Sequence, residues 1–195
     1  MISLNIFAKC PNTGNPKQRM GELLDKKGRS DLAKIMLINI LEEIRNINIS
    51  LKINLWVFPN INNEWIKKLS KKYLITLKKQ IGESLCSRMQ NCLLSESTLG
   101  GKTLLIGTDI PALSEKSISK AIKKLNNNDI VIGPTYDEGF YLIGIKDQEV
   151  AQCLANCENL KNYKDIKNKK LLVNQKIHIL EKLKDIDSPN DLLLI

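Results

Sequence analysis

The chain has 195 residues, of which 43% are hydrophobic and 26% are charged, a composition that predicts one folded domain over residues 1–195 and excludes a disordered chain. No run of about 18 uncharged apolar residues occurs, so no segment is expected to span a membrane. The net charge of +9 rests on 26 lysines and four arginines without interleaved aromatic residues, which argues against a nucleic-acid partner.

The expected compartment is the cytoplasm. The first residues lack the basic start, the long apolar stretch and the cleavage site of a signal peptide. The cysteines form no Cys-x-x-Cys pair and are expected to be free thiols: Cys10, Cys86, Cys92, Cys153 and Cys157. The single histidine, His178, argues against a His-based zinc site or a Ser-His-Asp triad.

Short apolar segments alternate with segments of helical period along the chain. The predicted strands are Leu4–Ala8, Ile53–Phe58, Leu74–Leu77, Thr103–Ile106, Ile130–Ile132 and Tyr141–Ile145. Several of them are continuously apolar, which is typical of strands covered on both faces in a mostly parallel sheet.

Helices are predicted between the strands. Apolar residues recur at helical spacing from Ala33 to Ile44 and from Ile118 to Leu125, where Ser114 is the expected N-cap. Two further helices are predicted. One begins at Trp65, and the other spans Leu85–Leu94. This alternation predicts an α/β fold with right-handed crossovers.

One connection is too short for a helical crossover. Only eight residues separate Ile132 from Tyr141, whereas a parallel crossover needs a dozen or more. The sixth strand is therefore expected to run antiparallel to its sequence neighbour or to lie elsewhere in the sheet. The predicted sheet is mixed and mainly parallel.

Polar clusters directly follow several strands, where open α/β sheets bind their ligands. After the first strand, Lys9, Lys17 and Arg19 lie in a loop whose composition suits phosphates, although a solvated basic loop is an equal alternative. After the fourth strand, Asp109 lies between Gly107 and Pro111. This carboxylate suits a hard divalent cation, or it is a turn-forming residue.

Two more acidic clusters follow. Asp137 lies in the glycine-containing loop 133–140, which forms either a second ligand site or a simple turn. Near the end of the sequence, Ser188, Pro189 and Asp191 have the pattern of an N-cap, a first helical residue and a capping box. Asp187, just before them, has no such structural explanation.

Taken in order, these clusters resemble a known bacterial family. The matching patterns are Phe7-Ala8-Lys9-x-Pro11 with Lys17-x-Arg19, Gly107-Thr108-Asp109-x-Pro111, Gly133-Pro134-x-x-Asp137-x-Gly139-Phe140-Tyr141-Leu142-Ile143-Gly144, and Asp185-x-Asp187-Ser188-Pro189-x-Asp191-Leu192. They are similar to the glycosyltransferase-like radical-SAM/selenodomain-associated transferases. These belong to the nucleotide-diphospho-sugar transferase superfamily, which also includes the molybdenum cofactor guanylyltransferases.

The resemblance implies a GT-A-like three-layer sandwich with a mixed, mainly parallel sheet. It implies a transferase that depends on Mg²⁺ or Mn²⁺ and acts on a nucleotide sugar or a nucleoside triphosphate (NTP), together with a small-molecule acceptor. The implied site residues are Asp109 and Asp137 for catalysis, Asp109 and Asp187 for the metal, and Lys9, Lys17, Arg19, Gly107 and Gly139 for substrate and phosphate. A homodimer is compatible with the resemblance.

The sequence departs from the family pattern at four positions. Gln18 replaces a threonine between the two cations, and Glu138 replaces a glycine after Asp137. Ser84 and Cys86 replace an acid and a glycine ahead of Arg88. These changes bear on the acceptor site and on activity.

Three functions follow as hypotheses. The first is transfer from a nucleotide-activated donor, of glycosyltransferase type. The second is nucleotidyl transfer from an NTP to a phosphorylated small molecule, with release of pyrophosphate. The third is a non-enzymatic, basic RNA-binding module. The loop that carries Lys17 and Arg19 is expected to be exposed, so that replacing either residue should leave folding almost unaffected.

Overall fold

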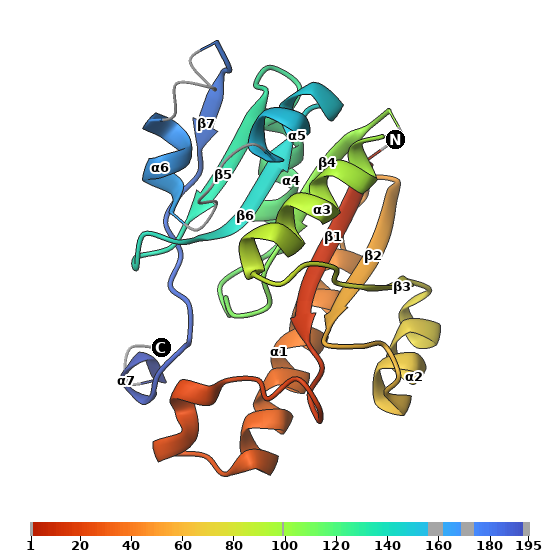
Figure 1. The fold of residues 1–195 in the computed structure, drawn as a ribbon, viewed down its shortest axis with the longest axis vertical. Coiled ribbons are helices and arrows are strands. Elements are labelled where there is room, and N and C mark those ends of the chain that lie inside the picture. The colour runs from red at the N-terminus through yellow and green to blue at the C-terminus, as the bar shows by residue number, and fades with distance from the viewer. Residues whose placement is uncertain (1, 99, 156–161, 169–173, 193–195) are drawn as a thin grey trace.

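A central sheet covered by helices on both faces organises the chain (Figure 1). The computed structural model describes residues 2–98, 100–155, 162–168 and 174–192. In this part of the chain the strands are β1 (Ile2–Lys9), β2 (Leu51–Phe58), β3 (Thr76–Lys79), β4 (Lys102–Ile106), β5 (Ile130–Pro134), β6 (Phe140–Ile145) and β7 (Ile177–Ile179). The helices are the 3-10 helix η1 (Gln18–Glu22), then α1 (Lys26–Arg45), α2 (Glu64–Tyr73), α3 (Leu85–Ser97), α4 (Glu115–Lys124), α5 (Gln148–Ala155), α6 (Tyr163–Asn168) and α7 (Pro189–Leu192).

The sheet is mixed, as the short connection before Tyr141 predicts. Its strand order is β3-β2-β1-β4-β6-β5-β7. β6 runs antiparallel to both of its neighbours, β4 and β5, whereas every other pairing is parallel. The parallel strands β1, β2 and β4 therefore end at one edge, and the loops after them meet there.

Two apolar clusters fill the space between the layers. On one face, α1, α2 and α4 pack residues such as Leu37, Ile66 and Ile118 against the sheet. On the other face, α3, α5 and α6 supply residues such as Leu93 and Leu154. This arrangement is the expected three-layer sandwich. No helix in the described part of the chain combines the length and the apolar character needed to cross a membrane.

One predicted strand is displaced, and one strand of the structure was not predicted. The expected strand at Leu74–Leu77 is displaced, because Leu74 ends α2 in the left-handed conformation (φ 53°) and is 92% exposed. β3 starts at Thr76 and runs through two lysines that apolar patterning does not select. The short strand β7, which carries His178 beside Val131, was not predicted, because three residues are too few to show a period.

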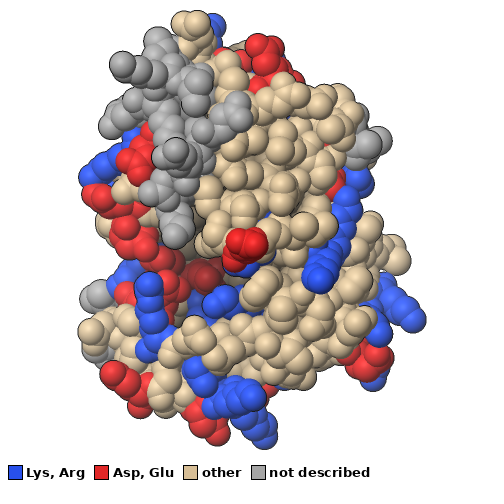
Figure 2. All heavy atoms as spheres, viewed as in Figure 1, with Lys and Arg blue, Asp and Glu red and all other residues tan. Residues whose placement is uncertain are grey.

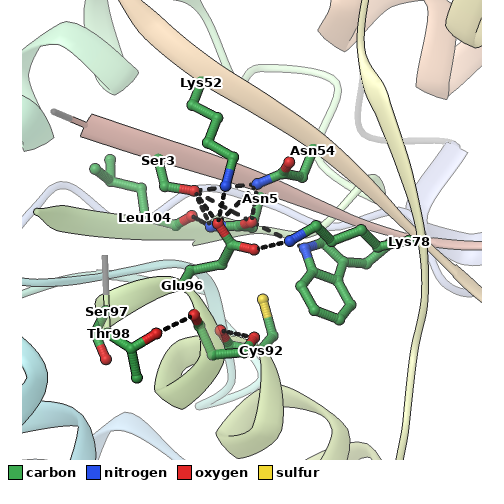
Figure 3. A network of polar contacts seen from close by, with 12 residues as sticks. Ser3, Asn5, Lys52, Asn54, Lys78, Cys92, Glu96, Ser97, Thr98 and Leu104 are labelled. Atoms are coloured by element: carbon green, nitrogen blue, oxygen red, sulfur yellow. Dashed lines mark hydrogen bonds and ion pairs between the residues drawn. The ribbon is translucent and has the colours of Figure 1, made fainter. Parts of the chain in front are cut away.

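A buried polar network lies on the amino-terminal half of the sheet, beneath α3 (Figure 3). Its centre is Glu96, whose side chain is fully buried and accepts hydrogen bonds from Ser3 (2.9 Å) and Asn54 (3.0 Å). Lys52, at 3.3 Å, and Lys78 pair with the same carboxylate. The network joins the last turn of α3 to β1, β2 and β3.

Candidate functional site

A cavity of about 560 Å³ opens at the carboxyl ends of β1 and β4. Figure 2 shows a hollow in this face of the molecule, with acidic and basic side chains meeting in it. Its charged side is lined by Lys9, Lys17, Arg19, Asp109 and Asp187, and the opposite side is mainly apolar. Three separate segments, the loop after β1, the loop after β4 and the segment before α7, thus bring their charged side chains to one place.

The loop after β1 is folded tightly against the sheet. A Cβ atom at Gly14 would lie 2.7–2.8 Å from backbone atoms of Cys10 and Phe58, so this position requires glycine. Lys17 has a left-handed backbone (φ 53°), a conformation that costs free energy in a residue with a Cβ. The tight loop points the Lys17 side chain inward instead of toward solvent.

Lys17 is the centre of the charged side. Its Nζ atom lies 2.5 Å from Asp109 Oδ1, 3.9 Å from Asp187 Oδ1, and donates to the Ile186 carbonyl oxygen at 2.5 Å. Only 4% of the side chain is exposed. The expectation that Lys17 is exposed was therefore wrong, whereas Arg19 is 74% exposed as predicted.

Acidic side chains crowd around this lysine. Burial, followed by the negative charge of Asp109, raises the pKa of Asp187 above its usual value, although Lys17 and Arg19 oppose the shift. Arg19 Nη1 donates to Asp187 Oδ2 at 3.2 Å. Burial and the charge of Asp137 raise the pKa of Asp185 in the same way. Burial and the neighbouring carboxylates therefore both disfavour the ionised forms of Asp185 and Asp187.

The two carboxylates expected to bind a metal lie on either side of Lys17. No group of three or more potential protein ligands comes together within the described residues. Mg²⁺, however, is usually held by one or two carboxylates together with substrate phosphates and waters. Asp109 and Asp187, each partly exposed at the cavity, fit a cation of this kind.

Other predicted site residues divide into two groups. Lys9 and Gly107 line the cavity. Asp137 and Gly139 are not among the lining residues. Asp137 Oδ1 instead accepts hydrogen bonds from Thr135 Oγ1 (2.5 Å) and the Gly139 amide (3.1 Å), which shapes the turn between β5 and β6. This geometry supports the turn interpretation for Asp137.

The departure at Glu138 has a clear structural result. Its backbone is left-handed (φ 71°), which explains why a glycine suits this position. Its carboxylate accepts from Asn162 Nδ2 at 3.1 Å and pairs with Lys164, so it fastens the β5–β6 turn to the start of α6. Glu138 neither narrows the cavity nor adds a carboxylate to its wall.

The remaining departures are also explained. Gln18 lines the cavity. Ser84 is the N-cap of α3, where its side chain accepts from the Ser87 amide in a capping box. Cys86 is buried in the core beneath α3. The predicted helix start at the end of the sequence is confirmed, since the amide and the hydroxyl of Ser188 both donate to Asp191.

The residues of the apolar side are not among those predicted from the sequence. Phe58, Gln80, Leu85, Arg88 and Met89 line it. The signal was present, because Arg88 and Met89 follow Ser84 and Cys86 in a segment that was compared with the family. A single arginine in the sequence, however, gives no indication of what it faces until the fold is known.

The fold is similar to that of solved structures described as nucleotide-diphospho-sugar transferases and nucleotidyltransferases. A protein of Desulfovibrio desulfuricans G20 with a provisional assignment as a nucleotide-diphospho-sugar transferase superposes with a TM-score of 0.84, at 22% identity over 98% of this chain and 84% of its own. The 4-diphosphocytidyl-2C-methyl-D-erythritol synthase of Anaerococcus prevotii gives 0.68, at 16% identity over 100% and 93% of the two chains.

The sequence comparison identifies the family. The chain belongs to the family DUF2064, described as "Uncharacterized protein conserved in bacteria", which matches residues 47–158. It is also 23% identical, over 92% of its length and 77% of the relative's, to the 2-phospho-L-lactate guanylyltransferase of Archaeoglobus profundus.

Proposed function

We propose that the protein is a nucleotidyltransferase that joins a nucleoside monophosphate, taken from an NTP, to a phosphorylated small molecule. The observation that carries this proposal is the convergence of Lys17, Arg19, Asp109 and Asp187 on one side of a cavity at the carboxyl edge. The names of the archaeal guanylyltransferase and of the structurally similar 4-diphosphocytidyl-2C-methyl-D-erythritol synthase support it.

The reaction needs charge neutralisation more than covalent catalysis. A phosphate oxygen of the acceptor forms a bond to the α-phosphorus of the NTP, and the bond from that phosphorus to the β-phosphate oxygen breaks, which releases pyrophosphate. Lys17 and Arg19 would neutralise charge on the phosphates, with Lys9 at the mouth. Asp109 and Asp187 would hold Mg²⁺ or Mn²⁺, and the bound cation would offset negative charge on the phosphate oxygens.

The test is pyrophosphate release from each of the four NTPs in the presence of Mg²⁺ or Mn²⁺. 2-Phospho-L-lactate, the substrate in the name of the archaeal relative, is the first acceptor to try, followed by other phosphorylated hydroxy acids. We expect Asp109→Asn to lower kcat at least about 100-fold, because it weakens the cation site.

Asp31→Asn is the matched control. Asp31 is 47% exposed and pairs with Lys34 at 2.8 Å, much as Asp109 is 50% exposed and pairs with Lys17, but it lies on α1 away from the charged side of the cavity. Its activity should equal that of the wild type. Full activity of a well-folded Asp109→Asn protein would contradict the proposed role of that carboxylate.

Glycosyl transfer is the second candidate, favoured by the high TM-score of the Desulfovibrio protein. It would also fit the resemblance to the radical-SAM/selenodomain-associated transferases. Nucleotide sugars would then release a nucleoside diphosphate, and no NTP would release pyrophosphate. An RNA-binding module would instead show RNA affinity that falls steeply with salt and no nucleotide-dependent shift in melting temperature.

A further inference from the structure

The apolar side of the cavity contains two polar side chains whose hydrogen-bonding groups are not all used. We name this region the α3 pocket and define it by Phe58, Gln80, Leu85, Arg88 and Met89. Phe58, Leu85 and Met89 supply flat or apolar surface suited to a ring. Selectivity among rings must come from Gln80 and Arg88.

Arg88 is held by a ring and has no charged partner. Its guanidinium carbon lies 4.1 Å from the centre of the Phe58 ring. Among the described residues no hydrogen bond or ion pair reaches the guanidinium, and its Nε atom is buried without a partner. The stacking fixes the plane of the guanidinium. The two terminal nitrogens, which are not among the buried unpaired atoms, remain as a fork of donors.

Gln80 complements this fork with an acceptor. Its side-chain Nε2 donates to the carbonyl oxygens of Ala8 (3.2 Å) and Trp56 (2.9 Å), which uses both amide hydrogens and fixes the orientation of the amide. The side-chain oxygen Oε1 has no partner in the described part of the chain and is not a buried atom. Gln80 is therefore available only as an acceptor.

Two donors and one acceptor are complementary to half of the nucleobases. Guanine presents two acceptors and then a donor along one edge (N7, O6, N1–H), and cytosine does the same (O2, N3, N4–H). Adenine and uracil present acceptor, donor, acceptor (N7, N6–H, N1 and O4, N3–H, O2), so a fork of donors would meet a donor. Paired acceptors on guanine are the commonest specific partner of an arginine fork.

We propose, on the basis of the nucleotide-binding function inferred above, that the α3 pocket selects a guanine or cytosine base and excludes adenine and uracil through Arg88 and Gln80. A carboxylate or phosphate of an acceptor is a poorer occupant. It would pair with Arg88 but would offer no hydrogen to Gln80 Oε1, which can only accept.

The test is equilibrium competition of GTP, CTP, ATP and UTP against a fluorescent nucleotide analogue, with Mg²⁺, on the full chain. GTP, CTP or both should bind at least about fivefold more tightly than ATP and UTP, the lower end of what one paired contact to a base discriminates. Arg88→Lys keeps the charge but not the fork, so it should reduce this ratio to nearly one without weakening ATP or UTP. If GTP is a preferred ligand, 7-deaza-GTP, which lacks N7, should bind to the wild type more weakly than GTP does. The Arg88→Lys protein should bind the two nucleotides equally.

Arg45→Lys is the matched control, because Arg45 also lies over an aromatic ring, that of Tyr73 at 6.0 Å, but outside the cavity. It should keep the wild-type ratio. The selectivity of the wild type tests the proposal even if Arg88→Lys does not fold. Equal binding of all four NTPs, a preference for ATP or UTP, or unchanged selectivity in a folded Arg88→Lys protein would overturn it while leaving nucleotide binding intact. Binding of no nucleotide would overturn the proposed function as well.

Discussion

Glu96 offers a sharp test of what holds α3 against the sheet (Figure 3). Its carboxylate is fully buried, whereas the side chains of Lys52 and Lys78 are 31% and 29% exposed. Glu96→Gln keeps the shape but removes the charge that both lysines face. Breaking a buried ion pair costs about 3–5 kcal/mol, and the lower end applies here because both lysines reach water.

We therefore expect Glu96→Gln to reduce the free energy of unfolding by about 3 kcal/mol, which lowers the melting temperature of a chain of this size by roughly 6–12 °C. Urea unfolding followed by circular dichroism measures the first quantity and calorimetry the second. Glu64→Gln is the control, because Glu64 is 80% exposed and its pair with Lys67 should contribute less than about 1 kcal/mol.

The pH dependence gives a second readout for Glu96. Burial raises its pKa, but hydrogen bonds from Lys78 and Ser3 outweigh this effect, so the pKa lies below its usual value. The stabilisation is thus present above the pKa of the unfolded chain and is lost as the pH falls through the lower, folded-state pKa. The difference between wild type and Glu96→Gln should shrink over the same range. A loss no larger than that of Glu64→Gln would refute the idea that the network anchors α3.

Three other substitutions test the site and the fold. Lys17→Met should lower both the melting temperature and the affinity for nucleotide, because it leaves Asp109 and Asp187 without the lysine that lies between them. Thermal shifts with and without nucleotide measure both quantities. An unchanged melting temperature would contradict the buried ion pairs of Lys17. Asp187→Asn should raise the melting temperature at pH 7, since the raised pKa means that ionised Asp187 destabilises the fold. This advantage over the wild type should disappear as the pH falls through that pKa and the wild-type carboxyl is protonated. A melting temperature at pH 7 below that of the wild type would contradict the direction of this pKa shift. Leu74→Gly should stabilise the protein by about 1 kcal/mol in urea unfolding, because glycine adopts the left-handed C-cap without strain, whereas Leu74→Ala should not.

The sequence predicted the fold well where apolar patterning and connection length decide the outcome. The eight residues between Ile132 and Tyr141 indicated the reversed direction of β6, and the apolar runs indicated a sheet covered on both faces. The sequence did not predict the two edge strands, β3 and β7, correctly. β3 and β7 are short strands with charged or polar members, and their pairing with β2 and β5 depends on tertiary contacts rather than on their own sequence.

For the site, the sequence indicated which residues carry charge but not which of them are buried. Lys17 and Arg19 are two positions apart, yet one is enclosed by Asp109 and Ile186 and the other extends into solvent. That difference arises from contacts across more than ninety residues of chain. Gln80 likewise becomes informative only when β1 and β2 lie close enough for their carbonyl groups to bind its amide.

The contact between Lys17 and Ile186 also has a consequence for synthesis on the ribosome. The two residues are separated by 168 intervening positions, and the Ile186 amide in addition donates to the Asp109 carbonyl oxygen. A nascent chain that ends before Ile186 already contains all strands described here, but Lys17 still lacks the carbonyl and the second carboxylate that neutralise it. The charged side of the cavity is therefore completed only when the segment that contains Ile186 and Asp187 docks, so a chain that lacks this segment would not have a competent site.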